Sequence, residues 1–117
     1  MKPRHFLYRG RSMHSTFLPG QELYIHPVST IPTPGDVVVY RKGKTYVVHR
    51  VKKVLETGIV TRGDNNPSDD DQLVLPTQVI GIVKKAGQGN SFQAIQGGRW
   101  GLFRAQVRWK AMDISSW

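Results

Sequence analysis

The sequence predicts a mainly β protein of one domain, with a curled antiparallel sheet or small barrel followed by a C-terminal amphipathic helix. First, 117 residues, 38% of them hydrophobic, can bury one core but not the cores of two ordinary domains. Second, short runs rich in β-branched and aromatic residues recur between turn residues, with no helical pattern between them. Third, three- and four-residue apolar spacing appears only near the C-terminus. We therefore expect a β domain over residues 1–95 and a basic helical extension over residues 96–117.

The expected strands are bounded by glycine and proline, which favour turns. In chain order the β-type runs are HFLYR, ELYIHPV, DVVVY, TYVVHRVKKV, GIVTR, QVIGIV and SFQAI. The third and fourth runs are separated by a short segment that contains Gly43, a residue able to adopt positive φ. This pattern predicts a β-hairpin.

Alternation along TYVVHRV places His49 on the same face as Val47 and Val51, and Arg50 on the opposite face. A half-buried face disfavours a charged imidazole and so favours the neutral form, which accepts a proton. On its own, a histidine on a strand is more often structural than catalytic.

The C-terminal segment from Trp100 to Trp117 has the spacing of a helix. Its apolar residues are Leu102, Phe103, Val107, Ala111 and Ile114, with Arg104, Arg108 and Lys110 among them. A basic helix that also carries tryptophan either packs on its domain or lies in a membrane interface.

The net charge of +9 is concentrated at the two ends of the chain. Residues 1 to 13 contain Lys2, Arg4, Arg9 and Arg11 without an acid, and from residue 84 onward the only acid is Asp113. This asymmetry either serves solubility or attracts an anionic surface, nucleic acid or the inner membrane leaflet.

The chain has no cysteine, which excludes disulfides, thiol chemistry and cysteine-based zinc sites. No apolar run approaches the roughly 20 residues of a membrane-spanning helix, and the first residues do not resemble a secretory signal. We therefore expect a cytoplasmic protein without a transmembrane segment or signal peptide, with peripheral contact at the inner membrane face as an alternative.

Four motifs occur in a specific order: GRSMHSTFLPGQEL, PTPGDVVVYR, VVHRV, and TRGDNNPSDDD followed by QVIGIV. Together they resemble the signal peptidase I superfamily over residues 8 to 84. The resemblance implies a small soluble serine endopeptidase that processes a protein or peptide. Because His49 stands where the usual bacterial members have lysine, the chain is similar to the Ser-His type of the endoplasmic reticulum and archaea.

The resemblance implies Ser12 as nucleophile, His49 as general base and Asp70 as the acid that orients His49, with Asp64 and Asp69 as alternatives. A serine hydroxyl needs a base to take its proton, and a carboxylate fixes the tautomer of that base. The backbone N–H of Ser12 is the expected oxyanion donor. This chemistry implies no cofactor and no metal.

Around the nucleophile, Met13 and Phe17 are expected either to line the substrate cleft or to anchor the loop in the core. The resemblance also implies a substrate bound as an extended strand at a sheet edge. The chain departs from the family at Ser15, where the family has proline, and at Gly10, where many bacterial members have a serine.

Three other functions remain open from the sequence. A basic barrel could bind single-stranded nucleic acid by stacking bases on Tyr8, Tyr24, Trp100 or Trp109. Metal binding would use His5, His14, His26 and His49, whose spacing matches no familiar site. Self-cleavage, as in the SOS-response repressors that share the superfamily fold, ranks below cleavage of another chain.

Overall fold

The computed structural model describes residues 4–28 and 31–115, with only the backbone of Arg4, Ile114 and Ser115. Lys2 and Trp117, which the sequence places in the basic N-terminus and the helical extension, lie outside the described residues. The strands are β1 (Arg4–Leu7), β2 (Glu22–Pro27), β3 (Val37–Lys42), β4 (Thr45–Leu55), β5 (Gly58–Arg62), β6 (Val79–Gln88) and β7 (Ser91–Ala94). A 3₁₀ helix, Pro76–Gln78, precedes β6, and the helix α1 (Gly98–Ser115) follows β7.

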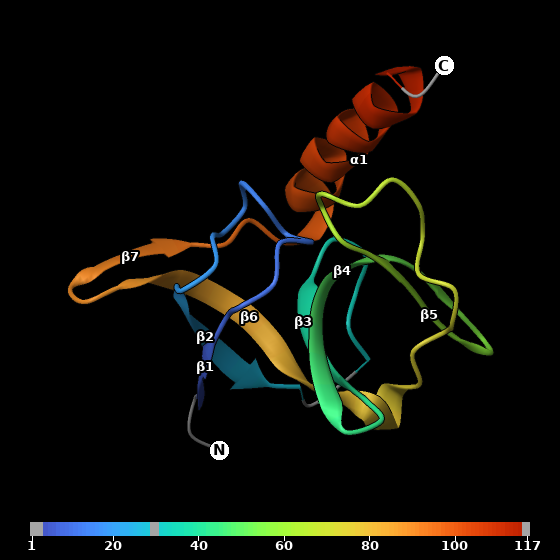
Figure 1. The fold of residues 1–117 in the computed structure, drawn as a ribbon. Coiled ribbons are helices and arrows are strands. Elements are labelled where there is room, and N and C mark those ends of the chain that lie inside the picture. Colours follow the sequence, from blue (N-terminus) through green and yellow to red (C-terminus); the bar gives the residue numbers. More distant parts are fainter. Residues whose placement is uncertain (1–3, 29–30, 116–117) are drawn as a thin grey trace.

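All seven strands form one antiparallel sheet in the order β1-β2-β6-β3-β4-β5, with β7 paired to β6 (Figure 1). The mainly β, single-domain prediction is therefore confirmed. The sheet curls but is not closed, because its two end strands, β1 and β5, do not pair with each other. On its outer side β5 is met by an isolated bridge between Ile59 and Val74.

The predicted hairpin is confirmed as β3 and β4, in which Val39 pairs with Val48 and Gly43 has a φ of 60° in the turn. Strand β3 is buried on both faces, which explains its continuous apolar sequence. Val37 and Val39 belong to a core cluster with Met13 and Phe17, and Val38 and Tyr40 belong to a second cluster with Val51 and Ile59. The two clusters lie on opposite faces of the strand, so β3 joins both halves of the core.

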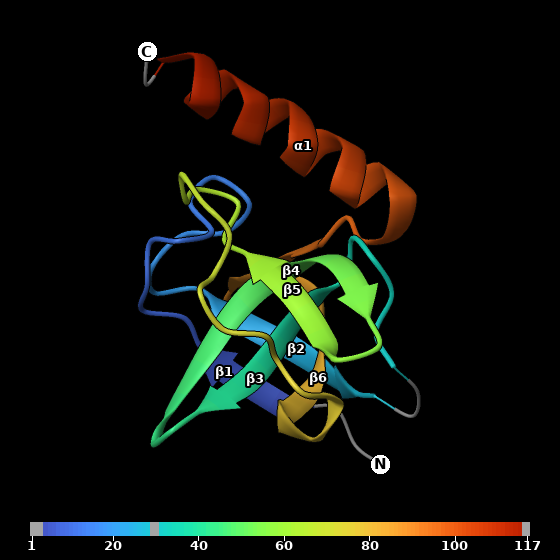
Figure 2. The same ribbon diagram turned by 90° about the vertical axis from the view of Figure 1, so that its right-hand side faces the viewer.

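Helix α1 lies across one end of the folded sheet (Figure 2). At its start the chain packs closely against the loop before β3: a Cβ on Gly35 would lie 1.8 Å from the carbonyl oxygen of Gly98, and Gly35 itself has a φ of 97°. Ala105 and Trp109 of α1 are buried. In the part of the chain that the structure describes, no helix has the length and apolar character needed to cross a bilayer.

Candidate active site

The loop between β1 and β2 carries Ser12 in a tight turn. The N–H of His14 donates to the carbonyl of Arg11 at 3.1 Å, and the N–H of Thr16 donates to the carbonyl of Met13 at 2.9 Å. The side chains of Met13 and Phe17 are almost fully buried, with exposed fractions of 0% and 1%. These two residues therefore anchor the loop in the core, and neither presents a surface to a substrate in this conformation.

Ser12 and His49 meet although 37 residues separate them in the sequence. The Oγ atom of Ser12 lies 3.0 Å from Nε2 of His49, and Nδ1 of His49 lies 2.5 Å from Oδ2 of Asp70. An ionised carboxylate only accepts hydrogen bonds, so Nδ1 carries the proton and donates to Asp70. Nε2 of the neutral ring is therefore the acceptor for the Ser12 hydroxyl.

The Oδ2 atom of Asp70 is the acceptor of several hydrogen bonds. Besides His49, Oγ1 of Thr61 donates to it at 2.6 Å and the hydroxyl of Tyr40 at 3.3 Å. Burial alone would raise the pKa of Asp70. The hydrogen bonds from His49, Thr61 and Tyr40, and the electrostatic interaction with His49, outweigh burial and hold this pKa below its ordinary value. Asp70 is thus held as the carboxylate.

Tyr40 remains a hydrogen-bond donor to this carboxylate. Burial, together with the nearby charge of Asp70, raises the pKa of Tyr40 to about 12. The backbone also positions Asp70, because its N–H donates to the carbonyl of Thr61 at 2.9 Å. The strand β5 therefore supplies both a side chain and a backbone group that place the acid beside His49.

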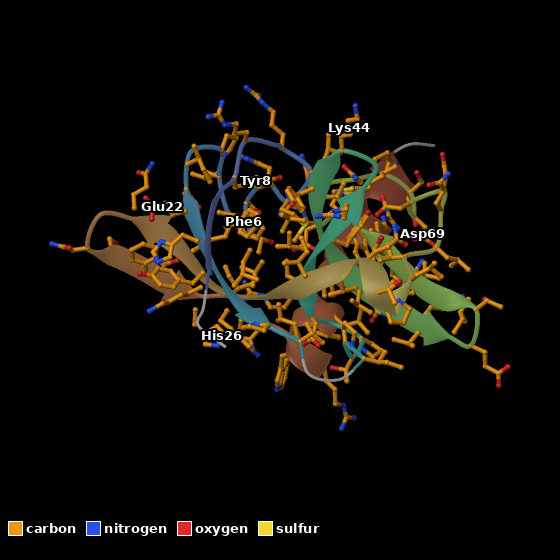
Figure 3. The ribbon with its side chains drawn as sticks, turned by 90° about the horizontal axis from the view of Figure 1, so that it is seen from below. Phe6, Tyr8, Glu22, His26, Lys44 and Asp69 are labelled. Carbon is orange, nitrogen blue, oxygen red and sulfur yellow. The ribbon has the colours of Figure 1, made fainter. Side chains whose placement is uncertain are left out.

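The two alternative acids lie elsewhere. Asp64 accepts two hydrogen bonds of 2.8 Å from the guanidinium of Arg50, and it also accepts one from Thr16 at 2.5 Å. Asp69 pairs with Lys52 at 2.9 Å on the surface. Figure 3 shows Asp69 on a flank of the molecule away from Tyr8. Of the three acids the sequence left open, Asp70 is the one that contacts His49.

Arg50 and Asp64 form a buried structural pair next to the site. Because side chains alternate along β4, Arg50 points away from the face that carries His49. Its guanidinium also donates to the carbonyls of Gly35 and Gln96, at 2.8 and 2.7 Å. Arg50 thus joins the loop before β3 to the segment before α1.

The loop that carries Ser12 rests directly on the Gly-Asp-Asn turn after β5. The N–H of Asn65 donates to the carbonyl of Ser12 at 2.7 Å. A Cβ on Gly63 would lie 2.6 Å from the same carbonyl oxygen, so only glycine allows this approach. The glycine at position 63 therefore helps to place Ser12.

Helix α1 also contacts both of these loops. Arg108 donates to the hydroxyl of Ser15 and, at 3.3 Å, to the side-chain oxygen of Asn65. The indole of Trp109 donates to the carbonyl of Gly63 at 3.1 Å. Ser15 has a φ of 70°, which a proline ring cannot adopt. This chain therefore has, at a position closed to proline, a serine whose hydroxyl is bound by the C-terminal helix.

The comparisons with known proteins identified no relative of this chain. No family model, no curated protein and no solved structure matches it. The geometry of the site is therefore the physical basis for assigning a function.

Tyr8 is a member of the site that sequence reasoning did not assign to catalysis. Its hydroxyl lies 3.4 Å from Oγ of Ser12 and accepts a hydrogen bond of 3.0 Å from the N–H of Met13. A Cβ on Gly10 would lie 3.2 Å from the Tyr8 hydroxyl, so the backbone before Ser12 packs closely on this side chain. In the sequence, the available signal was that Tyr8 precedes Ser12 by four residues. Tyr8 directly follows the end of β1, and a position at the end of a strand does not predict that its side chain contacts Ser12.

The expected oxyanion donor is free to act. Within residues 4–28 and 31–115, the N–H of Ser12 makes no hydrogen bond, whereas the next two N–H groups are used by Tyr8 and Arg11. This N–H, on the same residue as the hydroxyl, therefore has no competing acceptor among the described residues.

The residues proposed for the other functions are mostly engaged elsewhere. Tyr8 and Trp109 are buried, and the ring of Tyr24 is packed by His5, Phe92 and Lys85. His5 pairs with Glu22 at 3.2 Å. Within the described residues, no group of three or more potential ligands is arranged to hold a metal ion.

Proposed function

We propose that this chain is a serine endopeptidase of the signal peptidase I type, which cleaves a protein or peptide through an acyl-enzyme on Ser12. The observation that carries the proposal is the chain of contacts from Ser12 through His49 to Asp70, at 3.0 and 2.5 Å. A nucleophile, a base and an acid that orients the base occur here in the order that acyl transfer requires. The ordered motifs around Ser12 and His49 give independent support.

In the first half of the reaction, Oγ of Ser12 attacks the carbonyl carbon of the substrate while its proton passes to Nε2 of His49. The imidazolium that forms is stabilised by the Asp70 carboxylate, and the oxyanion by the N–H of Ser12. The C–N bond then breaks, and the proton on Nε2 leaves with the amine. The product is an ester between Ser12 and the acyl half of the substrate.

In the second half, water attacks this ester and His49 takes its proton. The bond to Oγ breaks, the proton returns to Ser12, and the carboxylic acid leaves. No other group is needed for the balance of atoms. Thr61 and Tyr40 keep Asp70 ionised through both halves, since both donate to its carboxylate.

The substrate we propose is an extended segment of polypeptide, as in maturation or signal-peptide processing. A strand-like segment satisfies its backbone groups on a sheet edge and presents its scissile bond to a fixed nucleophile. The proposed setting is the cytoplasm or the inner membrane face.

The test is labelling with a fluorophosphonate probe, combined with a peptide library read by mass spectrometry. We expect the wild-type protein to take up one probe molecule on Ser12, and Ser12→Ala and His49→Ala to take up none. Ser91→Ala is the matched control, because it makes the same chemical change at an exposed position on β7. Equal labelling and equal cleavage by wild type and Ser12→Ala would refute the proposal.

A further inference from the structure

Helix α1 has two apolar faces, of which the domain covers one. Gly101, Ala105 and Trp109 are buried against the sheet and its loops. Trp100, Phe103 and Val107 are 69%, 56% and 55% exposed. At about 100° per residue, the second set lies opposite the first. We call these three exposed residues the outer stripe.

The outer stripe is a continuous surface. Its members are spaced by three and four residues, so they follow one another along the helix. The rings of Trp100 and Phe103 pack edge to face, with centroids 6.1 Å apart. Figure 2 shows the helix across the end of the sheet, with one side facing away from the rest of the molecule.

Cations flank the outer stripe on both sides. Arg99 and Lys110 lie along one border and Arg104 along the other, and all three are exposed. The helix has one acid, Asp113, which lies toward the buried side, 3.9 Å from Arg62 of β5. The outer face therefore combines large apolar rings with positive charge.

We propose that the outer stripe of α1 docks this protein on the surface of an anionic lipid bilayer. Because the domain covers the other apolar face, α1 presents only its outer face, which can bury its apolar side chains at the headgroup boundary while its cations meet the lipid phosphates. Tryptophan is favoured at that depth. A second copy of the chain is a poorer occupant, because each copy has a net charge of +9 and the flanks of the stripe are positive.

The docked orientation would bring the nucleophile loop near the bilayer. The inner face of the same helix contacts that loop, through Arg108 to Ser15 and Trp109 to Gly63. If the proposed peptidase activity holds, the substrates are polypeptides presented at a membrane surface. The docking itself does not depend on that activity.

The test is co-sedimentation with lipid vesicles of phosphatidylcholine, alone or mixed with phosphatidylglycerol. We expect binding on the order of 100-fold stronger to the anionic vesicles, the contribution of three cations near a charged surface. The double variant Trp100→Ser/Phe103→Ser should lose this binding. Leu55→Ser/Leu75→Ser is the matched apolar control, since these leucines are 43% and 50% exposed and lie off the helix.

Charge is tested separately with Arg99→Glu/Lys110→Glu against Lys42→Glu/Lys44→Glu, which makes the same change on the β3–β4 hairpin. We expect the first pair to lose more binding than the second. Equal binding to both kinds of vesicle, or equal losses in the helix and control variants, would overturn the proposal. So would a dimer, seen by analytical ultracentrifugation, that the Trp100→Ser/Phe103→Ser variant abolishes. Each result is read on the intact protein and is independent of whether Ser12 takes up a probe.

Discussion

The hydroxyl of Tyr8 lies 3.4 Å from Oγ of Ser12 and is held there by the N–H of Met13, which donates to it at 3.0 Å. Because Tyr8 accepts from Met13, its own proton is free to point at Ser12. The Ser12 proton in turn points at His49. This arrangement places a donor beside the oxygen that becomes negative as the proton leaves.

Replacing Tyr8 with phenylalanine removes this donor and keeps the ring that packs on Phe17. We expect kcat to fall by about tenfold, the effect of one hydrogen bond to a developing charge, with little change in KM. The rate of probe labelling at Ser12 should fall in parallel. A Tyr8→Phe variant with unchanged labelling and kcat would show that Tyr8 only supports the loop.

Asp70 and Asp69 are adjacent, but only Asp70 contacts His49. We expect Asp70→Asn to lower kcat on the order of 10³- to 10⁴-fold, because the amide no longer stabilises the imidazolium or the correct tautomer. Asp69→Asn makes the same chemical change but removes only the half-exposed ion pair with Lys52. Because a surface ion pair contributes about 0–1 kcal/mol to stability, we expect this variant to keep its activity. Steady-state kinetics on the two variants compares them. Similar losses of activity would contradict the assignment of the acid.

The lowered pKa of Asp70 makes the stability of the fold depend on pH in a defined direction. Because the pKa of Asp70 is lowered in the folded chain, its carboxylate stabilises the fold at pH values above the ordinary pKa of about 3.9. That contribution is lost as the pH falls through the folded pKa. We therefore expect the free energy of unfolding of the wild-type protein to approach that of Asp70→Asn below about pH 4. Urea denaturation of both proteins at several pH values measures this difference. A difference that grows as the pH falls would contradict the lowered pKa.

We expect Asp64 to contribute to the stability of the fold, whereas we expect Asp70 to contribute to catalysis. Asp64 and Arg50 are 2% and 3% exposed, so removing one partner leaves the other charge buried. We expect Asp64→Ala to lower the free energy of unfolding by about 3–5 kcal/mol. Chemical denaturation measures this directly. A loss within about 0.5 kcal/mol, the range of ordinary surface changes, would show that the pair is not buried in solution.

Arg108 is expected to act on the nucleophile through the loop that it holds. Arg108→Ala removes the contacts with Ser15 and Asn65, and we expect the rate of probe labelling at Ser12 to fall about tenfold while KM for a peptide changes little. Arg108→Lys should recover part of the loss. Arg41→Ala, at an exposed position of β3, is the control. If all three variants are labelled at the wild-type rate, α1 does not position the loop.

The sequence by itself determined the class of the fold and the strand that carries His49. Alternation and turn residues act over a few neighbours, so the β3–β4 hairpin and the face of His49 follow from local pattern. The ordered motifs also made Ser12 and His49 a testable pair before their distance was known. The helix was predicted from its spacing in the same way, but its apolar residues lie on two opposite faces and not on the single face of an ordinary amphipathic helix.

Only the tertiary structure decided which acid meets His49 and which other groups join the site. Asp64, Asp69 and Asp70 lie in a loop without periodic geometry, so their directions depend on contacts with Arg50, Lys52 and Thr61 from distant parts of the chain. The roles of Tyr8 and Arg108 likewise depend on loop closure and on where α1 packs. Local patterns specify which way a strand residue points, whereas a site made of loops takes its geometry from the packing of the whole domain.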